Sequence, residues 1–402
     1  MKQRRWVLTA LLLCSIPFRT DAQDVVFSPP VNVSNTPALS GPEALAIDAS
    51  GTIYVLWEES RSSILFSRSS DGGETFIPPQ TVIPPDRDSS PGQVAVASGS
   101  PGMVHTSVTQ FDTVFGGAAI SYLRSIDGGD TFSSPQLMST RDGINYIKSS
   151  IATDGNGAVG IAWAGANLRT GQNNISYSRS IDNGDTFSAP MILTDADTLP
   201  VYCPDIKTFG AQNVYIVWNQ KLSVVGDDSD TFFTRSVDGG LSFTTPINIS
   251  NLPGRGWCPK TAVDESGNIY VVWEKGQAFL SRKTLFVKST DGGLSFNAPP
   301  LSISDPTGDS ACSSFAAAGT GKVYITFTYS TNHESALVFS GDGGGRFTPP
   351  FSIPRAICPE IATRNQNEIG LTWSEPPSPG DYTDVFYMRG VVSLTSSVGR
   401  GK

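Results

Sequence analysis

The 402-residue sequence is poor in charged residues, histidine and long apolar runs, and each shortage excludes a class of protein. Only 16% of residues are charged, and the net charge of −9 comes without any basic cluster, so nucleic acid is not expected as a partner. Two histidines, His105 and His333, favour neither a zinc site nor a Ser-His-Asp triad. Beyond the N-terminus no apolar run is long enough for a membrane helix, and no glycine pattern of a phosphate-binding loop occurs. We therefore expect no cofactor and no stable membrane insertion.

The N-terminus has the pattern of a secretory signal peptide. Residues 1–5 are basic, residues 6–18 are apolar, and the small residue Ala22 offers a cleavage site. We expect residues 1–22 to be removed, residues 23–391 to form a single domain and residues 392–402 to be a short polar tail. The product is then exported, either to a periplasm or out of the cell.

What the sequence does contain is an internal repeat. The pattern Ser-x-Asp-x-Gly-x-x-Phe occurs six times, and the intervals between its aspartates are 56, 55, 56, 53 and 51 residues. The aspartates are Asp71, Asp127, Asp182, Asp238, Asp291 and Asp342. Near-constant spacing of this kind predicts a repeat architecture, and no segment shows a helical period.

Each repeat predicts four short strands. In the fullest copy, residues 259–264, 268–273 and 284–289 are β-branched and aromatic runs separated by turn residues, and a fourth run ends at Ile303. Four antiparallel strands per unit predict one blade of a β-propeller, and seven second strands predict seven blades. The last unit lacks its fourth strand, which residues 25–33 are expected to supply so that the ring closes. Six blades with a peripheral last unit is the alternative.

The six motifs resemble the Asp-box, or BNR repeat, of the sialidase superfamily, and the resemblance covers nearly the whole mature chain. It implies that the boxes lie between the third and fourth strands, on the face opposite the functional site, and that their aspartates are structural. A carboxylate that accepts backbone hydrogen bonds and a glycine with positive φ both suit a turn. One acid per box is too few for calcium, so no metal is expected. The family includes sialidases, other glycosidases, photosystem assembly factors and sorting receptors, so the resemblance is specific for fold rather than for activity.

Strand order predicts which loops share the functional face: those that join second to third strands and those that join successive blades. We expect these loops to present arginines, aromatic side chains and glutamates to an anion or a glycan, because guanidinium pairs with carboxylate at two points. The candidates are Arg87, Arg141, Arg255, Arg355, Trp257, Tyr202, Tyr146, Glu58, Glu274 and Glu375.

Other recurring residues are expected to be structural. His105 occupies an apolar position of a second strand, so it should be packed. Arginines recur just before the Asp motifs and are expected on the blade surface. They are Arg68, Arg124, Arg179 and Arg235.

The resemblance does not extend to the catalytic signature of sialidases, which use three arginines, a Tyr–Glu pair and an acid/base Asp. The N-terminal Arg-Ile-Pro signature is absent, Ile353-Pro354-Arg355 has another order, and Tyr382 matches only by position. No catalytic residue can be named. We therefore expect a monomeric, non-catalytic module that binds a glycan or an extracellular protein through its loop face. A sialidase-like exo-glycoside hydrolase acting on an anionic sugar is the alternative.

Four of the five cysteines occupy one repeat position in consecutive units: Cys203, Cys258, Cys312 and Cys358. An even number in an exported chain predicts disulfides. Cys203–Cys258 with Cys312–Cys358 is the first hypothesis. Cys258–Cys312 is its competitor, and a thiolate metal site is a further alternative.

Overall fold

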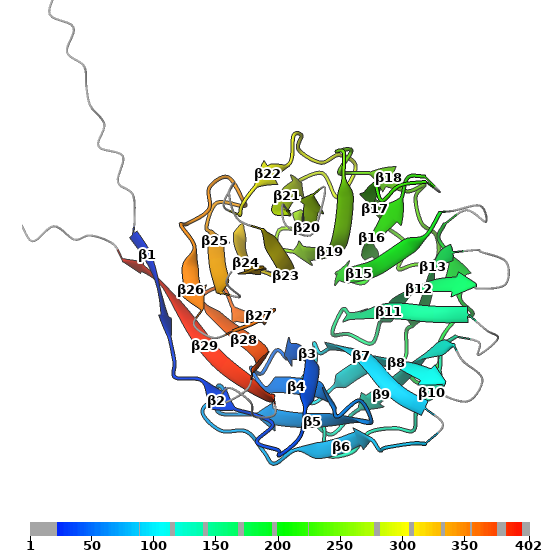
Figure 1. Cartoon of the computed structure of the whole chain (residues 1–402), viewed down its shortest axis with the longest axis vertical. Coiled ribbons are helices and arrows are strands. Elements are labelled where there is room, and N and C mark those ends of the chain that lie inside the picture. The colour runs from blue at the N-terminus through cyan, green and yellow to red at the C-terminus, as the bar shows by residue number, and fades with distance from the viewer. Residues whose placement is uncertain are drawn as a thin grey trace, which may run out of the picture.

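The computed structural model of the chain describes residues 22–87, 89–112, 117–139, 144–167, 173–194, 199–223, 225–276, 282–304, 309–330, 334–353, 356–375 and 383–395. Within these ranges the strands form seven antiparallel sheets arranged around a central axis (Figure 1). The chain is thus an all-β, seven-bladed propeller, as the repeat predicts, and the six-bladed alternative is wrong. No helix in the described ranges has the length and apolar character to cross a membrane.

Six blades are built from four consecutive strands each, with the first strand innermost (Figure 1). The first two are β3 (Ser40–Ile47), β4 (Ile53–Glu59), β5 (Ser63–Ser69), β6 (Gln80–Ile83), and β7 (Ser89–Ala97), β8 (Val104–Asp112), β9 (Ala118–Ser125), β10 (Gln136–Leu137). The next two are β11 (Ile144–Thr153), β12 (Val159–Asn167), β13 (Asn173–Ser180), β14 (Met191–Ile192), and β15 (Val201–Phe209), β16 (Asn213–Lys221), β17 (Ser229–Ser236), β18 (Ile247–Asn248). The last two are β19 (Arg255–Val263), β20 (Ile269–Gly276), β21 (Lys283–Ser289), β22 (Leu301–Ser302), and β23 (Ser310–Ala318), β24 (Lys322–Tyr329), β25 (Ser335–Ser340), β26 (Phe351–Ile353).

The seventh blade joins the two ends of the chain. Its strands β27 (Glu360–Asn365), β28 (Glu368–Glu375) and β29 (Asp384–Thr395) are completed by β1 (Ala22–Phe27) and β2 (Val31–Asn32), which both pair antiparallel with β29. The predicted closing strand is therefore present, but two prolines that cannot donate to the ladder divide it in two. Pairing also extends to Thr395, into the segment expected to be a tail.

Each Ser-x-Asp-x-Gly motif forms a tight turn after a third strand, which we call an Asp turn. In the second blade, Asp127 Oδ1 accepts hydrogen bonds from Ser125 Oγ at 2.7 Å and from the Thr131 amide at 2.9 Å. Ser125 Oγ in turn accepts from the Gly129 amide at 2.7 Å. Hydrogen bonds, first from the Thr131 hydroxyl, lower the pKa of Asp127 to about 2. The same three bonds recur in the other five turns, so these aspartates hold the backbone.

The Asp turns also lock neighbouring blades together. Phe132 of the second turn packs edge to face on Phe66 of the preceding blade, with ring centroids 5.2 Å apart. Equivalent pairs are Phe76–Tyr387, Phe187–Tyr122, Phe243–Tyr177, Phe296–Phe233 and Phe347–Phe286. The recurring arginines are not merely on the surface, because each donates to a backbone carbonyl in the next blade's Asp turn. These arginines are Arg68, Arg124, Arg179 and Arg235.

His105 is a packed strand residue, as predicted. It is 2% exposed in β8, and its Nδ1 lies 2.7 Å from the hydroxyl of Tyr122. Burial lowers its pKa to about 4, so the imidazole is neutral at physiological pH.

Candidate functional site

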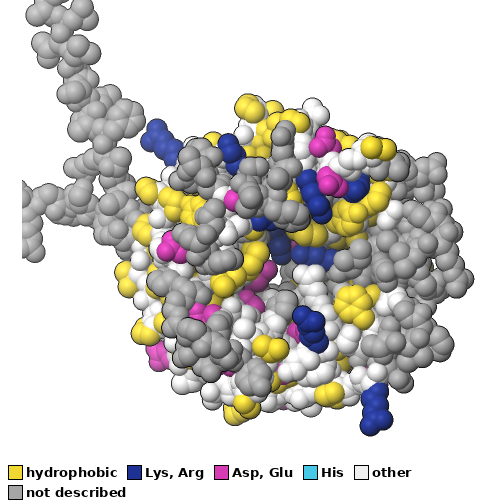
Figure 2. All heavy atoms as spheres, in the orientation of Figure 1, with side chains coloured by type: hydrophobic (Ala, Val, Ile, Leu, Met, Phe, Trp, Pro, Cys, Tyr) yellow, Lys and Arg dark blue, Asp and Glu magenta, His cyan; other side chains and the backbone are white. Residues whose placement is uncertain are grey.

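The axis of the propeller is hollow. A cavity of about 440 Å³ lies between the first strands, lined by residues of β3, β7, β11, β15, β19, β23 and β27. Its lining residues belong mainly to the middle of these strands, and Ile357 and Cys358 lie in the connection between the sixth and seventh blades. A second cavity of about 270 Å³ shares part of this lining and extends toward the Asp-turn end. We call the larger cavity the channel mouth, and Figure 2 shows charged side chains gathered around the central hollow.

Six charged side chains from five blades line the channel mouth, and sequence analysis named none of them as a site residue. They are Glu43, Lys148, Asp205, Lys207, Lys260 and Glu360. Glu43, Lys148, Asp205 and Lys260 each follow a register shift, in β3, β11, β15 and β19 respectively. A bulge re-aims the side chains beside it, which explains how a strand of the inner core turns a charged residue toward the axis.

Glu360 and Lys260 form the closest charged pair of the channel mouth. Glu360 Oε1 lies 3.8 Å from Lys260 Nζ, and Glu360 Oε2 accepts a hydrogen bond of 2.7 Å from Ser314 Oγ. The negative charge of Glu360 raises the pKa of Lys260. The pair therefore favours the charged form of Lys260 and links the fifth blade to the seventh.

The carboxyl group of Glu43 has a different hydrogen-bond partner from that of Glu360. Its Oε2 accepts a hydrogen bond of 2.6 Å from Ser374 Oγ. Burial, reinforced by the nearby charge of Glu360, raises the pKa of Glu43 to about 8. At pH 7 the channel mouth thus contains a protonated carboxyl group on β3.

Asp205 and Lys148 lie on adjacent first strands. Asp205 uses both oxygens within the protein, because Oδ1 accepts from Ser150 Oγ at 3.2 Å and Oδ2 from the Thr261 amide at 2.8 Å. Lys148, by contrast, has no hydrogen-bond acceptor or ion-pair partner among the described residues. Burial, and then repulsion by Lys260, lowers its pKa to about 8.

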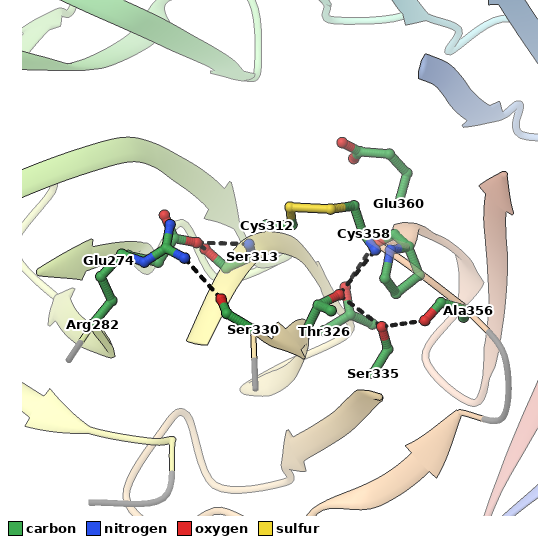
Figure 3. Close-up of a disulfide and its surroundings, with 12 residues drawn as sticks. Glu274, Arg282, Cys312, Ser313, Thr326, Ser330, Ser335, Ala356, Cys358 and Glu360 are labelled. Atoms are coloured by element: carbon green, nitrogen blue, oxygen red, sulfur yellow. Dashed lines mark hydrogen bonds between the residues drawn. A yellow bond between two sulfur atoms is a disulfide. The ribbon is translucent and has the colours of Figure 1, made fainter. Parts of the chain in front are cut away.

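Two disulfides bridge neighbouring blades at the channel mouth. Cys203 pairs with Cys258 and Cys312 with Cys358, with Cα atoms 5.0 and 4.9 Å apart. This confirms the first of the two pairings considered, and Cys258–Cys312 is wrong. Figure 3 shows the second bridge between the Glu274–Ser313 hydrogen bond and Glu360. In the fourth, fifth and sixth blades the first strand begins before its cysteine, at Val201, Arg255 and Ser310.

An arginine pair surrounds Trp257 in the fifth blade. The guanidinium carbons of Arg255 and Arg282 lie 5.5 and 5.2 Å from the centre of the Trp257 ring system. Arg282, which sequence analysis did not select, also binds Asp309 through Nε at 3.1 Å and Ser330 through Nη2 at 2.8 Å. The Trp257 ring is therefore in contact with positively charged side chains and is not an uncovered surface on which a ligand could stack.

The predicted site residues do not all lie in loops. Arg255, Trp257 and Tyr202 belong to first strands, whereas Glu58, Glu274 and Glu375 end second strands. These residues were expected in loops because they lie beyond the apolar runs that mark the strands. The hydrogen-bonded pairing of the strands nevertheless continues beyond these runs, as the pairing of Trp257 with Glu274 shows.

The predicted site residues also differ in how deeply they are buried. Glu274 is 4% exposed, and its Oε1 accepts from the Ser313 amide at 2.7 Å and from the Ser313 hydroxyl. Burial raises the pKa of Glu274 and of the half-buried Glu58. Glu375 is buried, Tyr202 is partly buried, and Arg87 is exposed. Outside the described residues lie Arg141, Arg355, Tyr382, His333 and the side chain of Tyr146.

The charged residues of the channel mouth left only a weak signal in the sequence. Asp205, Lys260 and Glu360 each stand two residues after a repeat cysteine, in a strand that is otherwise apolar or small. A charge at one repeated inner position is the pattern that pointed to the axis. Among the described residues, no group of three or more His, Cys, Asp or Glu side chains is placed to hold a metal ion.

No protein-family model and no curated protein matches the sequence. Several solved structures share the architecture. A polysaccharide lyase described as an ulvan lyase aligns with a TM-score of 0.59 and 13% identity, over 89% of this chain and 95% of that one. An α-L-arabinofuranosidase of Fusarium graminearum, solved with arabinobiose, aligns with a TM-score of 0.53 and 14% identity, over 90% and 96% of the two chains. An α-L-arabinanase of Penicillium chrysogenum gives 0.50 and 13%, over 91% and 97%. At such identities the likeness establishes the fold alone.

Proposed function

We propose that the chain is an exported carbohydrate-binding propeller that receives a saccharide at the channel mouth. The observation that carries the proposal is the cavity of about 440 Å³ into which five blades direct charged groups. Pockets of a few hundred Å³ with a few converging polar groups are typical of small-ligand sites. A protein partner generally needs a contact face of about 800 Å² per side, for which an axial cavity is a poor match.

The lining chemistry suits a ligand rich in hydroxyl groups. Carboxylates at Asp205 and Glu360 accept hydrogen bonds, ammonium groups at Lys148 and Lys260 donate them, and Gln93 does both. The disulfides on either side fix the strands that carry these groups, so little ordering is required when a ligand enters.

The wider context supports the same proposal. Two disulfides suit an oxidising compartment, which agrees with the signal peptide expected in residues 1–22. The Asp-box resemblance connects the chain with a superfamily that handles glycans, and the solved structures of similar fold include enzymes of saccharides.

A glycoside hydrolase is the second candidate, and the contrast between Glu43 and Glu360 favours it. Glycosidases place two carboxyl groups across the scissile bond, one protonated as general acid and one ionised. Glu43, which is protonated at neutral pH, meets the requirement for the acid, and Glu360, which pairs with Lys260, is the candidate for the second carboxyl group. We rank binding first, because the arginine cluster of sialidases has no counterpart among the described residues.

Titration calorimetry of the mature chain against a panel of neutral and acidic oligosaccharides tests the proposal. We expect binding, and a loss of roughly tenfold or more in affinity for Glu360→Gln. Glu265→Gln, an exposed residue at the Asp-turn end, serves as the matched control and should bind normally. The proposal fails if no saccharide binds, or if both variants behave alike.

The same panel separates binding from hydrolysis. If released sugars accumulate over time and Glu43→Gln abolishes release while preserving affinity, the hydrolase replaces the binding module as the leading function. If no product forms at any pH between 4 and 9, binding stands alone.

A further inference from the structure

Lys148 is a cation of the channel mouth without a partner. It projects from β11 into the lining of the cavity, and no described residue lies within hydrogen-bond or ion-pair distance of its ammonium group. An ammonium group removed from water costs free energy unless an acceptor or an opposite charge replaces the water. Lys148 is therefore not expected to stabilise the fold, which suggests that its positive charge has another role.

The charges that face Lys148 do not neutralise it. They are Lys260, Glu360, Asp205 and Glu274, and Lys207 of β15 lines the same cavity. Each of the three acids already has partners of its own. Glu360 accepts a hydrogen bond from Ser314 and pairs with Lys260. Asp205 accepts from Ser150 and Thr261, and Glu274 accepts from Ser313. Glu43, the remaining acid of the cavity, is protonated at neutral pH because its pKa is about 8. The strongest charge effect on Lys148 is repulsion by Lys260, so the two ammonium groups share one region of the cavity.

We propose that Lys148 and Lys260 form an anion-binding subsite in the channel mouth, which accepts a carboxylate or sulfate group carried by the bound saccharide. The inference rests on the proposed function and specifies its ligand as an acidic sugar. An anion between the two lysines replaces their repulsion with two attractions and supplies the acceptor that Lys148 lacks. Lysine serves this role as a compact point charge, so the subsite selects charge more than planar geometry.

The subsite has a defined pH dependence. Lys148 must be protonated to attract an anion, and in the empty cavity its pKa is about 8. Affinity for an acidic saccharide should be constant from pH 6 to 7 and fall as the pH rises above about 8. Ionisation of Glu43 in the same range adds repulsion, so the fall should be shallower in Glu43→Gln.

Calorimetry at pH 7 with matched probes tests the subsite. The probes are a uronate oligosaccharide, its carboxyl-reduced neutral counterpart, a sulfated oligosaccharide, sodium acetate and sodium sulfate. We expect Lys148→Met to weaken acidic saccharides by roughly tenfold to a hundredfold and the neutral counterpart by less than twofold. Lys283→Met, which removes an exposed charge at the start of β21, should change neither. A preference for uronate or for sulfate identifies the source of the anion.

A labelling experiment on the unmodified chain covers the case in which Lys148→Met does not fold. A lysine of low pKa reacts readily with acetic anhydride at pH 8, and an anion bound to it should slow acetylation of Lys148, measured by peptide mass mapping, by more than fivefold relative to Lys283. Equal affinity for acidic and neutral probes, with no protection of Lys148, overturns the subsite while leaving saccharide binding intact. Protection by acetate or sulfate without affinity for any saccharide supports the subsite and overturns the carbohydrate function. Absence of both binding and protection overturns both.

Discussion

Gly129 of the second Asp turn lies against the ring of Phe66 in the first blade, so closely that a Cβ atom on Gly129 would be 2.2 Å from Phe66 Cζ. Gly129 also has a φ of 95°, which other residues rarely adopt. The repeat thus demands glycine here for two reasons, backbone conformation and contact between blades.

Replacing Gly129 should separate these two reasons. We expect Gly129→Ala to lower the free energy of unfolding by about 2–4 kcal/mol, combining an unfavourable φ with a clash against a packed ring. Gly226→Ala is the control, since Gly226 has a φ of 99° and no atom within 4 Å of an added Cβ. Its cost should be only about 1–2 kcal/mol. Urea unfolding measures both, and equal losses would refute the importance of the contact between blades.

The disulfides should contribute strongly to stability. They close segments with sequence separations of 55 and 46, for which loop-closure entropy gives about 4 kcal/mol each. We expect the double variant Cys312→Ser, Cys358→Ser to lose about that amount in urea unfolding. Reduction of the unmodified chain should reproduce the loss of both bridges. A loss below about 1 kcal/mol would mean that residual structure already restricts the unfolded chain.

A buried ion pair ties the fourth blade to the fifth. Lys275 Nζ lies 2.6 Å from Asp230 Oδ1 and 2.6 Å from the Ser229 carbonyl, and the two side chains are 4% and 2% exposed. Lys275→Met leaves an uncompensated carboxylate, so we expect a loss of about 3–5 kcal/mol. The double variant Lys275→Met, Asp230→Asn should recover part of this loss. Additive effects of the two changes would contradict a direct coupling.

Glu43 should make stability depend on pH. Its pKa is about 8 when folded and near the ordinary value when unfolded, so its contribution is complete below about pH 4.5 and disappears as the pH rises through 8. Glu43→Gln has no such loss. We expect the variant to match the unmodified chain at pH 4 and to exceed it by up to about 5 kcal/mol at pH 9. Thermal unfolding across this range, with Glu265→Gln as control, tests it, and a constant difference would exclude the shifted pKa.

The architecture was readable from the sequence because its determinants are local and repeated. A Ser, an Asp, a Gly and a Phe at a fixed spacing specify one turn, and the strand-end tryptophans of most blades mark the second strands. Trp57, Trp163, Trp218, Trp273 and Trp373 are all buried. Even the cysteine pairing followed from position, since equivalent points on neighbouring inner strands lie close together.

The channel mouth was harder to predict because it depends on register. A shift between Trp257 and Lys260 turns Lys260 toward the axis, and nothing in the spacing of apolar residues encodes that shift. Of the residues that were predicted from the type of their side chain, Glu274 is hydrogen-bonded to Ser313, and Trp257 is in contact with two arginines. Side-chain type could suggest candidates, whereas the distances among them required the structure.

The closure of the ring has a consequence for biosynthesis. Ser34 and Asp384 are hydrogen-bonded across 350 positions of sequence, and β1 pairs with β29 as far as Thr395. During synthesis β1 must therefore wait until all the strands up to β29 have followed it. Premature termination before β29 leaves β1 and β28 without their common neighbour, and such exposed edges favour aggregation and proteolysis. Closure of the seventh blade thus requires that translation has passed β29.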